Sequence, residues 1–327
     1  MASDSLVRGV TSSPGGDDSL GAGAAGTIRA VIGALADLGS FVAQRFSTLV
    51  ERGETYVFLL PIYVVMLTGE RALHELRRRP KWDDRDGAAN VTITVVSLLK
   101  DLWLGHLLPL AILAWLYGHA RLFTLPAGGA GLLAAFVLYD LCWYVDHRIA
   151  HRTGLFWAFH QVHHSSREFN FTVASRGFLL DSFATRPLFY LLPVLGVSPS
   201  QYISIQILTN IFGIFQHTRL IRRLGPIDGV LATPSNHRVH HGSNSKYLDR
   251  NYGEVLIVWD RLFGTFTREE EEPVFGLTKN IDTYNPISIE ISGIRWLVDR
   301  MRSAKHLSDK IRYLWMPPEW RHDGEDG

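Results

Sequence analysis

The chain has 327 residues, of which 46% are hydrophobic and 11% aromatic, so it is long enough to bury a large core. Its 33 basic and 32 acidic residues leave a formal net charge of +1, which excludes the basic excess typical of nucleic-acid-binding proteins. A single cysteine, Cys142, excludes an internal disulfide and a cysteine-based zinc site, whereas fourteen histidines point to imidazole chemistry.

The N-terminal segments differ in composition from the rest of the chain. Residues 1–27 are rich in Gly, Ser, Ala and Asp and lack regular apolar spacing, which predicts a disordered tail. Residues 28–54 place apolar side chains at helical spacing with charged residues between them. This pattern predicts an amphipathic helix that lies at a membrane interface.

Four apolar blocks follow, and several approach the roughly 20 residues that cross a bilayer. They cover residues 56–68, 101–118, 125–145 and 187–215. Soluble core helices usually keep a polar face, whereas these blocks are apolar all round, so we expect an all-α integral membrane bundle of about four to five transmembrane or hairpin helices. Pro193, Gly196 and Pro199 predict that the last block is a hairpin of two short helices.

Charge predicts the orientation of these blocks. The basic segment "HELRRRPKWDDR" at 74–85 directly follows the first block, and an excess of Lys and Arg marks the cytoplasmic side. Counting the blocks from there places the later polar segments at the same, cytoplasmic face. The basic amphipathic segment within residues 281–327 predicts a C-terminal surface helix and tail.

Histidines recur in these polar segments at ligand spacing. The motifs "DHRIAH", "HQVHH" and "HRVHH" contain His147 and His151, then His160, His163 and His164, and finally His237, His240 and His241. Residues three and four apart share one face of a helix, where two imidazoles can bind one metal or two adjacent metals. Eight imidazoles are about twice what one tetrahedral zinc needs, so two metal ions are indicated; Zn, Fe, Cu and Ni all suit this ligand.

Other polar residues have less certain roles. His217 ends the apolar hairpin on the histidine side and is a ninth candidate ligand. Asp146 and Asp260 either accept a ligand imidazole N–H or pair with the neighbouring arginines. Isolated histidines are more often structural than metal-binding, and we assign that role to His74, His106, His119, His306 and His322.

Together the segments "HRIAH", "FWAFHQVHHSS", "FNFTVASR", "FQHT", "TPSNHRVHHGSN" and "NYGEVLIVWDRLFGTF" carry a resemblance to a known family. In their order and spacing they resemble the fatty acid hydroxylase / sterol desaturase superfamily of integral membrane di-iron oxidases, and within it the branch similar to alkylglycerol monooxygenase. One departure is the sequence Arg176-Gly177-Phe178, where many sterol-acting members have a further histidine. That difference favours His217 as the residue that completes the ligand set.

The resemblance implies a catalytic domain over residues 55–280 that binds two Fe ions and uses O2 as co-substrate. The motif histidines would be catalytic and metal-binding, with His217 as a further ligand. Electrons would come from an external donor, for which a cytochrome, a ferredoxin and a reduced pterin stay open. The implied reaction is hydroxylation or desaturation of an unactivated C–H bond in a lipid such as a sterol, a fatty acyl chain or an ether lipid.

An alternative is a non-redox zinc protein, either a membrane hydrolase or a metal-binding module. Recombinant histidine sites also fill with zinc when it is available. A zinc hydrolase usually needs a nearby carboxylate base, as in H-E-x-x-H, and the sequence contains no such motif. The oxidase is therefore the favoured interpretation.

Overall fold

The computed structural model of the chain describes residues 56–77, 82–100, 107–180 and 186–322. The predicted tail at 1–27 and the predicted interfacial helix at 28–54 lie outside these residues, as do residues 101–106 of the second apolar block. Everything described below belongs to the unit Val50–Gly327.

The described residues are helical and contain no β-strand, which confirms the predicted all-α class. The first half contains α2 (Tyr56–Leu76), α3 (Asp84–Lys100), α4 (Leu107–His119), α5 (Gly129–Arg152), α6 (Gly154–His164) and the 3₁₀ turn η2 (Val173–Ser175). The second half contains η3 (Pro187–Tyr190), α8 (Leu191–Val194), α9 (Pro199–Gln216), η4 (Gly225–Gly229), α10 (Pro234–His240), α11 (Val258–Leu262), α12 (Pro286–Ser303) and α13 (Leu307–Trp315).

A sharp corner joins α5 to α6. Thr153 is extended, with φ −133° and ψ 134°, and it interrupts the helix for one residue. The next residue, Gly154, lies so close to α13 that an added Cβ would be 2.0 Å from the carbonyl oxygen of Tyr313. Only glycine fits so close to the backbone of another helix. Because of this corner, the end of α5 faces the side of α6 that lines the cavity.

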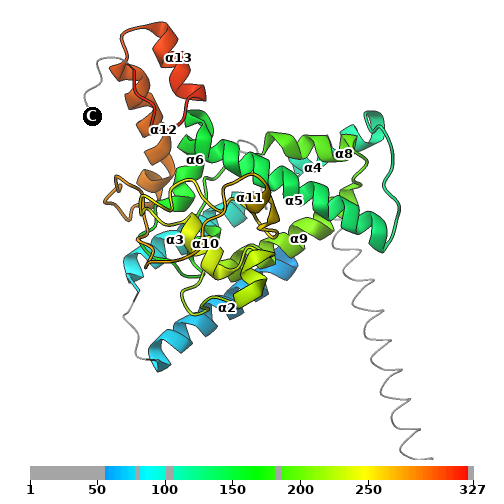
Figure 1. The fold of residues 1–327 in the computed structure, drawn as a ribbon, viewed down its shortest axis with the longest axis horizontal. Helices are drawn as coiled ribbons and strands as arrows, with labels where there is room; N and C mark the ends of the chain where they lie inside the picture. The colour runs from blue at the N-terminus through cyan, green and yellow to red at the C-terminus, as the bar shows by residue number, and fades with distance from the viewer. Residues whose placement is uncertain (1–55, 78–81, 101–106, 181–185, 323–327) are drawn as a thin grey trace, which may run out of the picture. The chain divides into compact units, whose positions relative to one another are not determined.

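The break predicted within the last apolar block is present. The helical turns η3 and α8 end at Val194, Gly196 follows with a φ of +80° that suits glycine, and α9 then begins at Pro199. Ser198 and Gln201 form a capping box at the start of α9, which satisfies its first backbone amides. The hairpin brings the far end of α9 back to α10, which packs against it (Figure 1).

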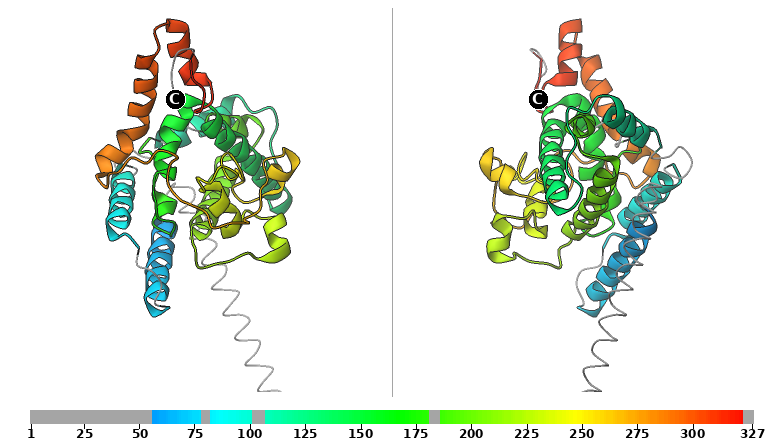
Figure 2. Two further views of the ribbon diagram at one scale, coloured as in Figure 1. Left: turned by 60° about the vertical axis from the view of Figure 1, so that its left-hand side comes forward. Right: turned by 90° about the vertical axis from the view of Figure 1, so that its right-hand side faces the viewer.

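The C-terminal helices pack on α6 rather than standing alone. Figure 2 shows α12 and α13, in orange and red, beside α6. The buried side chains Ile289 and Leu297 of α12 contact Val162 and Ala158 of α6, in two apolar clusters that also include residues of α3 and α13. These contacts hold α6, which carries the second histidine motif, from its outer side.

Among the described residues, one helix is long and apolar enough to cross a membrane. It is α5, and 33% of its most apolar 18-residue window is buried within the structure. The larger set of membrane segments predicted from the sequence stays a prediction.

Candidate metal centre

Nine histidines converge from four segments of the chain into two groups. The five-histidine group contains His147, His151, His160, His164 and His240. The four-histidine group contains His163, His217, His237 and His241. Within each group, one ring nitrogen per residue lies within 4.8 Å of all the others. The structure therefore brings together every histidine of the three motifs and His217.

The local fold explains this convergence. The α5–α6 corner turns His147 toward His160, and their Nε2 atoms lie 3.0 Å apart. The short helix α10 begins at Pro234, a residue suited to a first helical turn, and places His237 and His240 three residues apart on one face. His217 directly follows α9 and meets His237 of α10, with Nε2 atoms 3.0 Å apart.

The two groups adjoin each other. The rings of His164 and His241, one from each group, stack with centroids 4.3 Å apart. His237 and His240, also from different groups, stack with centroids 5.3 Å apart. The site is therefore one continuous cluster with two sets of converging nitrogens.

Backbone carbonyls fix the orientation of four of the rings. Each of these histidines donates its Nδ1–H to a carbonyl oxygen at 2.7–3.0 Å: His147 to Tyr252, His163 to Arg176, His217 to Gly213 and His240 to Arg250. Because a carbonyl can only accept, the proton of each neutral ring resides on Nδ1. The lone pair of each ring is then on Nε2, the atom through which a metal ion would bind.

The Nε2 atoms have the arrangement that a metal ion requires. His163 and His217 both donate through Nδ1, yet their Nε2 atoms face each other at 3.3 Å, so two lone pairs meet without a proton between them. Two nitrogens bound to one ion at about 2.1 Å would lie about 3.0–3.4 Å apart. Four Nε2 pairs lie 3.0–3.3 Å apart.

Three further nitrogens support the same interpretation. Within the described residues, Nε2 of His151, His240 and His241 is buried and has no hydrogen-bond partner. A buried polar atom without a partner is costly, and a bound cation would satisfy all three. The donor set therefore fits metal ions.

Burial also keeps the rings neutral. Loss of solvent lowers the pKa of several histidines well below the ordinary value, and the positive charge that neighbouring rings would carry lowers it further. These histidines are His160, His164, His217, His237, His240 and His241. Neutral imidazole is the form that binds metals, so the environment prepares the site for them.

The predicted roles of Asp146 and Asp260 are wrong in detail. Asp146 accepts the backbone N–H of Leu188 at 3.2 Å, and Asp260 accepts the backbone N–H groups of Tyr252 and Gly253, both at 2.8 Å. Among the described residues, neither carboxylate bonds to a histidine. Asp260 nevertheless supports the site indirectly, because it fixes Tyr252, whose carbonyl accepts from His147.

One carboxylate that the sequence did not single out lies at the site. Asp249 Oδ1 is 3.5 Å from Nδ1 of His151, and Asp249 Oδ2 accepts from Arg152 at 2.5 Å. Asp249 has a φ of +57°, which is uncommon outside glycine. No periodic pattern in the sequence identifies such a loop residue. The one available signal is that Asp is among the residue types that tolerate a positive φ.

A buried ion pair clamps α3 to the second histidine motif. The guanidinium of Arg176, 1% exposed, bonds to Asp86 at 3.1 Å and to Asn90 at 2.7 Å, both on α3. It also bonds to Ser165, at the end of α6. Because the Arg176 carbonyl accepts from His163, this network reaches the four-histidine group through one residue.

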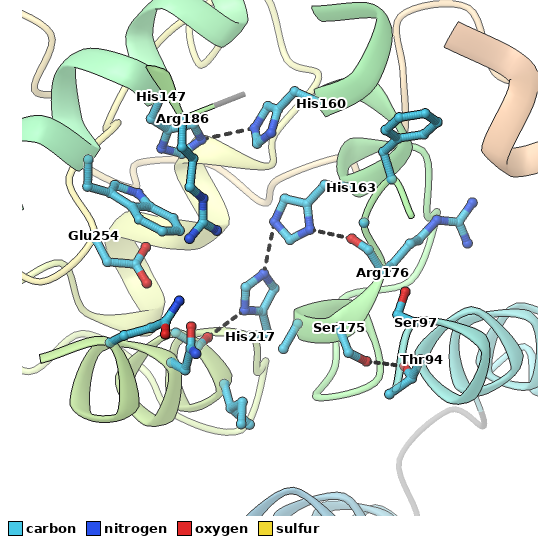
Figure 3. Close-up of a pocket in the computed structure, with 18 of the residues that line it drawn as sticks. Thr94, Ser97, His147, His160, His163, Ser175, Arg176, Arg186, His217 and Glu254 are labelled. Atoms are coloured by element: carbon cyan, nitrogen blue, oxygen red, sulfur yellow. Dashed lines mark hydrogen bonds between the residues drawn. The ribbon is translucent and has the colours of Figure 1, made fainter. Parts of the chain in front are cut away.

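A cavity of about 400 Å³ opens beside the histidines. Its lining includes His147 and His160 of the first group and His163, His217 and His237 of the second. Apolar walls come from α2, α3, α6 and the segment after η2, with Leu59, Leu60, Leu98, Phe159 and Phe178. Figure 3 shows Arg186 and Glu254 on one side of His217, and Ser175 and Thr94 on the other.

The isolated histidines stay apart from this cluster. His119 faces the Trp115 carbonyl, and His322 bonds to the hydroxyl of Tyr313. Neither these two nor His74 and His306 belong to a histidine group, and His106 lies outside the described residues.

The segment that holds this centre is similar to a known protein family. Residues 132–265 match the fatty acid hydroxylase family, and this segment contains all nine grouped histidines. This match confirms the resemblance predicted from the motifs.

The chain is also similar to individual curated proteins. It is 32% identical to alkylglycerol monooxygenase of Homo sapiens over 277 residues, which make up 84% of this chain and 62% of the human protein. It is 38% identical to the Danio rerio alkylglycerol monooxygenase over 187 residues, 57% of this chain and 42% of that protein. Ornithine lipid hydroxylase OlsE of Rhizobium tropici is 33% identical over 131 residues, 40% of each chain.

These matches confirm the predicted similarity to the alkylglycerol monooxygenase branch. The chain spans less than two thirds of the length of each of these relatives. No solved structure matches it significantly.

Proposed function

We propose that this chain is a membrane-embedded lipid oxygenase, in which the two histidine groups each bind an iron ion. The enzyme would insert one atom of O2 into a C–H bond of a lipid, and the other atom would leave as water with two electrons and two protons from an external donor. The observation that carries this proposal is the set of nine converging histidines, five of which line a largely apolar cavity.

The metal ions would supply the redox chemistry that no side-chain acid or base can perform on an unactivated C–H bond. The protein residues provide the geometry around them. Carbonyl groups hold four imidazole rings in a fixed orientation, so the ligands need not rearrange when metal binds. The apolar walls position a hydrocarbon chain and exclude water from the reacting carbon.

A bilayer setting supports a lipid as the substrate. The helix α5 is apolar enough to cross a membrane and ends in His147 and His151, so we propose that it delivers these ligands to the membrane face. Exposed apolar side chains on α2 and α3, among them Val65 and Val95, suit contact with lipid. We further propose several membrane passes and a cytoplasmic centre, on the charge pattern of residues 74–85.

The relatives guide the choice of lipid. Their names specify alkylglycerols and ornithine lipids, which are lipids with polar headgroups. We propose hydroxylation as the reaction; on a carbon next to an ether oxygen, it would give a hemiacetal that separates into an aldehyde and an alcohol.

The test compares the lipids of cells that express the wild-type chain, His240→Ala or His119→Ala. His240 belongs to the five-histidine group, whereas His119 lies outside both groups and serves as the matched control. We expect a lipid that gains one oxygen, or an ether lipid that disappears, in the wild-type and His119→Ala cells only. Purified, iron-loaded protein that consumes no oxygen with any lipid class and a reductant would contradict the proposal.

A further inference from the structure

A second cavity, of about 220 Å³, lies beside the start of α10. Its lining includes Ser235 and Asn236, which directly precede His237 in the third histidine motif. Within the described residues, it shares no lining residue with the cavity beside the histidines. Most of its other lining residues are charged or are glycines, so this cavity suits a polar ligand rather than a hydrocarbon chain.

Three arginines line this second cavity from different segments of the chain. Arg223 precedes η4, Arg261 belongs to α11 and Arg268 follows α11. The guanidinium of Arg261 lies 5.1 Å from the ring centroid of Phe266 and donates to the carbonyl of Gly229 at 3.4 Å. Within the described residues, none of the three arginines has a carboxylate partner. Their charges are therefore not offset by ion pairs inside the protein.

Two carboxyl groups also line the cavity, and both bond to other groups. Asp228 accepts from the backbone N–H of Leu224 at 2.9 Å and from the hydroxyl of Thr233 at 2.5 Å. Glu269 accepts from two nitrogens of the Arg238 guanidinium, at 2.6 and 2.7 Å, so its charge is neutralised by that buried ion pair. The three arginines thus outweigh the one carboxylate, Asp228, that has no cationic partner among the described residues.

An anion is the ligand that this arrangement suits. A guanidinium group presents several N–H donors in one plane, which match the oxygens of a phosphate group in paired hydrogen bonds. The acidic residues that follow in the chain do not line the cavity. Glu270 and Glu271 lie 3.4 and 3.5 Å from Lys246 and pair with that residue instead.

The surface around the cavity is apolar. Leu224 and Leu262 directly follow Arg223 and Arg261 in the sequence. They belong to a set of exposed apolar side chains on and beside η4 and α11, which are 40–69% exposed: Leu224, Ile227, Val230, Leu262 and Phe263. The two segments adjoin, because the backbone N–H of Ile257 donates to the carbonyl of Val230 at 3.0 Å. Apolar side chains next to arginines are typical of a surface that contacts lipid headgroups.

Contacts with α5 place this surface near the end of that helix. Trp259 of α11 donates its ring N–H to Asp140 at 2.9 Å, and Phe263 stacks on Tyr144 with ring centroids 5.4 Å apart. Asp140 and Tyr144 shortly precede His147 in α5, against which α11 packs (Figure 1). With α5 across the bilayer, the exposed apolar side chains lie at the membrane interface, and the long arginine side chains reach the lipid phosphates.

We propose that Arg223, Arg261 and Arg268 bind the phosphate group of an anionic phospholipid, in the leaflet that holds the metal centre. This inference goes beyond the proposed reaction and rests on the proposed function only for the position of α5 in the bilayer. The phospholipid is a bound structural lipid rather than the substrate, because its site is separate from the cavity beside the histidines. It connects η4, α10 and α11 through one ligand.

The experiment measures which phospholipid stays bound to the full chain. Iron-loaded protein in mild detergent is incubated with equal amounts of phosphatidylglycerol and phosphatidylcholine, captured and washed, and the retained lipids are quantified by mass spectrometry. We expect wild-type protein to retain phosphatidylglycerol about tenfold or more over phosphatidylcholine. Arg223→Gln and Arg268→Gln should each lower this preference about fivefold, and the double variant should abolish it.

Arg85→Gln is the matched control. It makes the same chemical change at an exposed arginine of α3 that does not line the cavity, so the preference for phosphatidylglycerol should stay as in the wild type. Iron content and melting temperature should match the wild type in every variant, because Arg223 and Arg268 are exposed. A changed lipid preference then reports the cavity rather than a loss of folding.

Three outcomes decide between the alternatives. Equal retention of the two lipids by wild-type protein, or an unchanged preference in the double variant, would overturn the site. Loss of phosphatidylglycerol in excess inorganic phosphate, compared with chloride at the same ionic strength, would assign the arginines to a soluble anion and overturn the lipid. Selective retention of phosphatidylglycerol by protein that consumes no oxygen with any lipid would support the site and contradict the proposed reaction instead.

Discussion

Replacement of Arg176 by Met tests how strongly the clamp between α3 and the second histidine motif stabilises the protein. Arg176 is 1% exposed, and its guanidinium donates to Asp86, Asn90, Ser165 and the carbonyl of Val162. Met fills a similar volume but removes the charge and every donor. Loss of one partner of a buried ion pair costs about 3–5 kcal/mol, because the remaining charge stays buried.

Denaturant titration in detergent micelles would measure this loss as a change in the free energy of unfolding. The exposed Arg295→Met serves as the matched control and should change stability by less than about 0.5 kcal/mol. Asp86→Asn would complete a double-mutant cycle, in which the double variant loses about 1–3 kcal/mol less than the sum of the single variants. A loss below about 1 kcal/mol for Arg176→Met would refute the argument that this pair clamps α3 to α6.

Three further predictions concern the metal centre. His217→Ala leaves three histidines in the smaller group, so purified protein should hold about half the iron of the wild type by elemental analysis, and full iron content would contradict its role as a ligand. Asp249→Asn weakens the electrostatic support of His151 and should lower metal affinity about 10–100-fold in a chelator competition, whereas unchanged affinity would assign Asp249 to the fold alone. The metal-free protein should lose stability in acid. Because burial lowers the pKa of histidines such as His237 below the ordinary value of 6.5, the unfolded chain binds more protons, and the melting temperature should fall as pH drops from about 7 toward about 5; a flat profile would refute this.

The sequence reveals the ligands because their chemistry requires a local pattern. Helical spacing places His160 and His164 on one face before any tertiary contact is known, and repeated triplets are rare by chance. His217 has no such pattern; its position at the end of an apolar hairpin and the absence of a histidine at residues 176–178 indicated it. The structure places it with its Nε2 3.0 Å from that of His237.

The supporting groups could not be predicted in the same way. Most of the N–H groups that orient the rings donate to backbone carbonyls. Every residue has a backbone carbonyl, so the amino-acid sequence does not indicate which one accepts. The sequence offered the carboxylates of Asp146 and Asp260 as acceptors for a ligand imidazole, but both accept from backbone amides instead. Arg223 and Arg268 were also missed, because a single arginine acquires meaning only from the cavity into which the fold places it.

The length of α5 has a consequence for where the enzyme works. From Gly129 to His147 and His151 the helix rises about 27 and 33 Å, whereas the hydrocarbon core of a bilayer is about 30 Å thick. With α5 across the bilayer, as proposed, the first two ligands lie at the headgroup level of one leaflet. The enzyme would then act on that leaflet alone, so the rate at which lipids flip between leaflets would limit how much of a membrane's substrate it can consume.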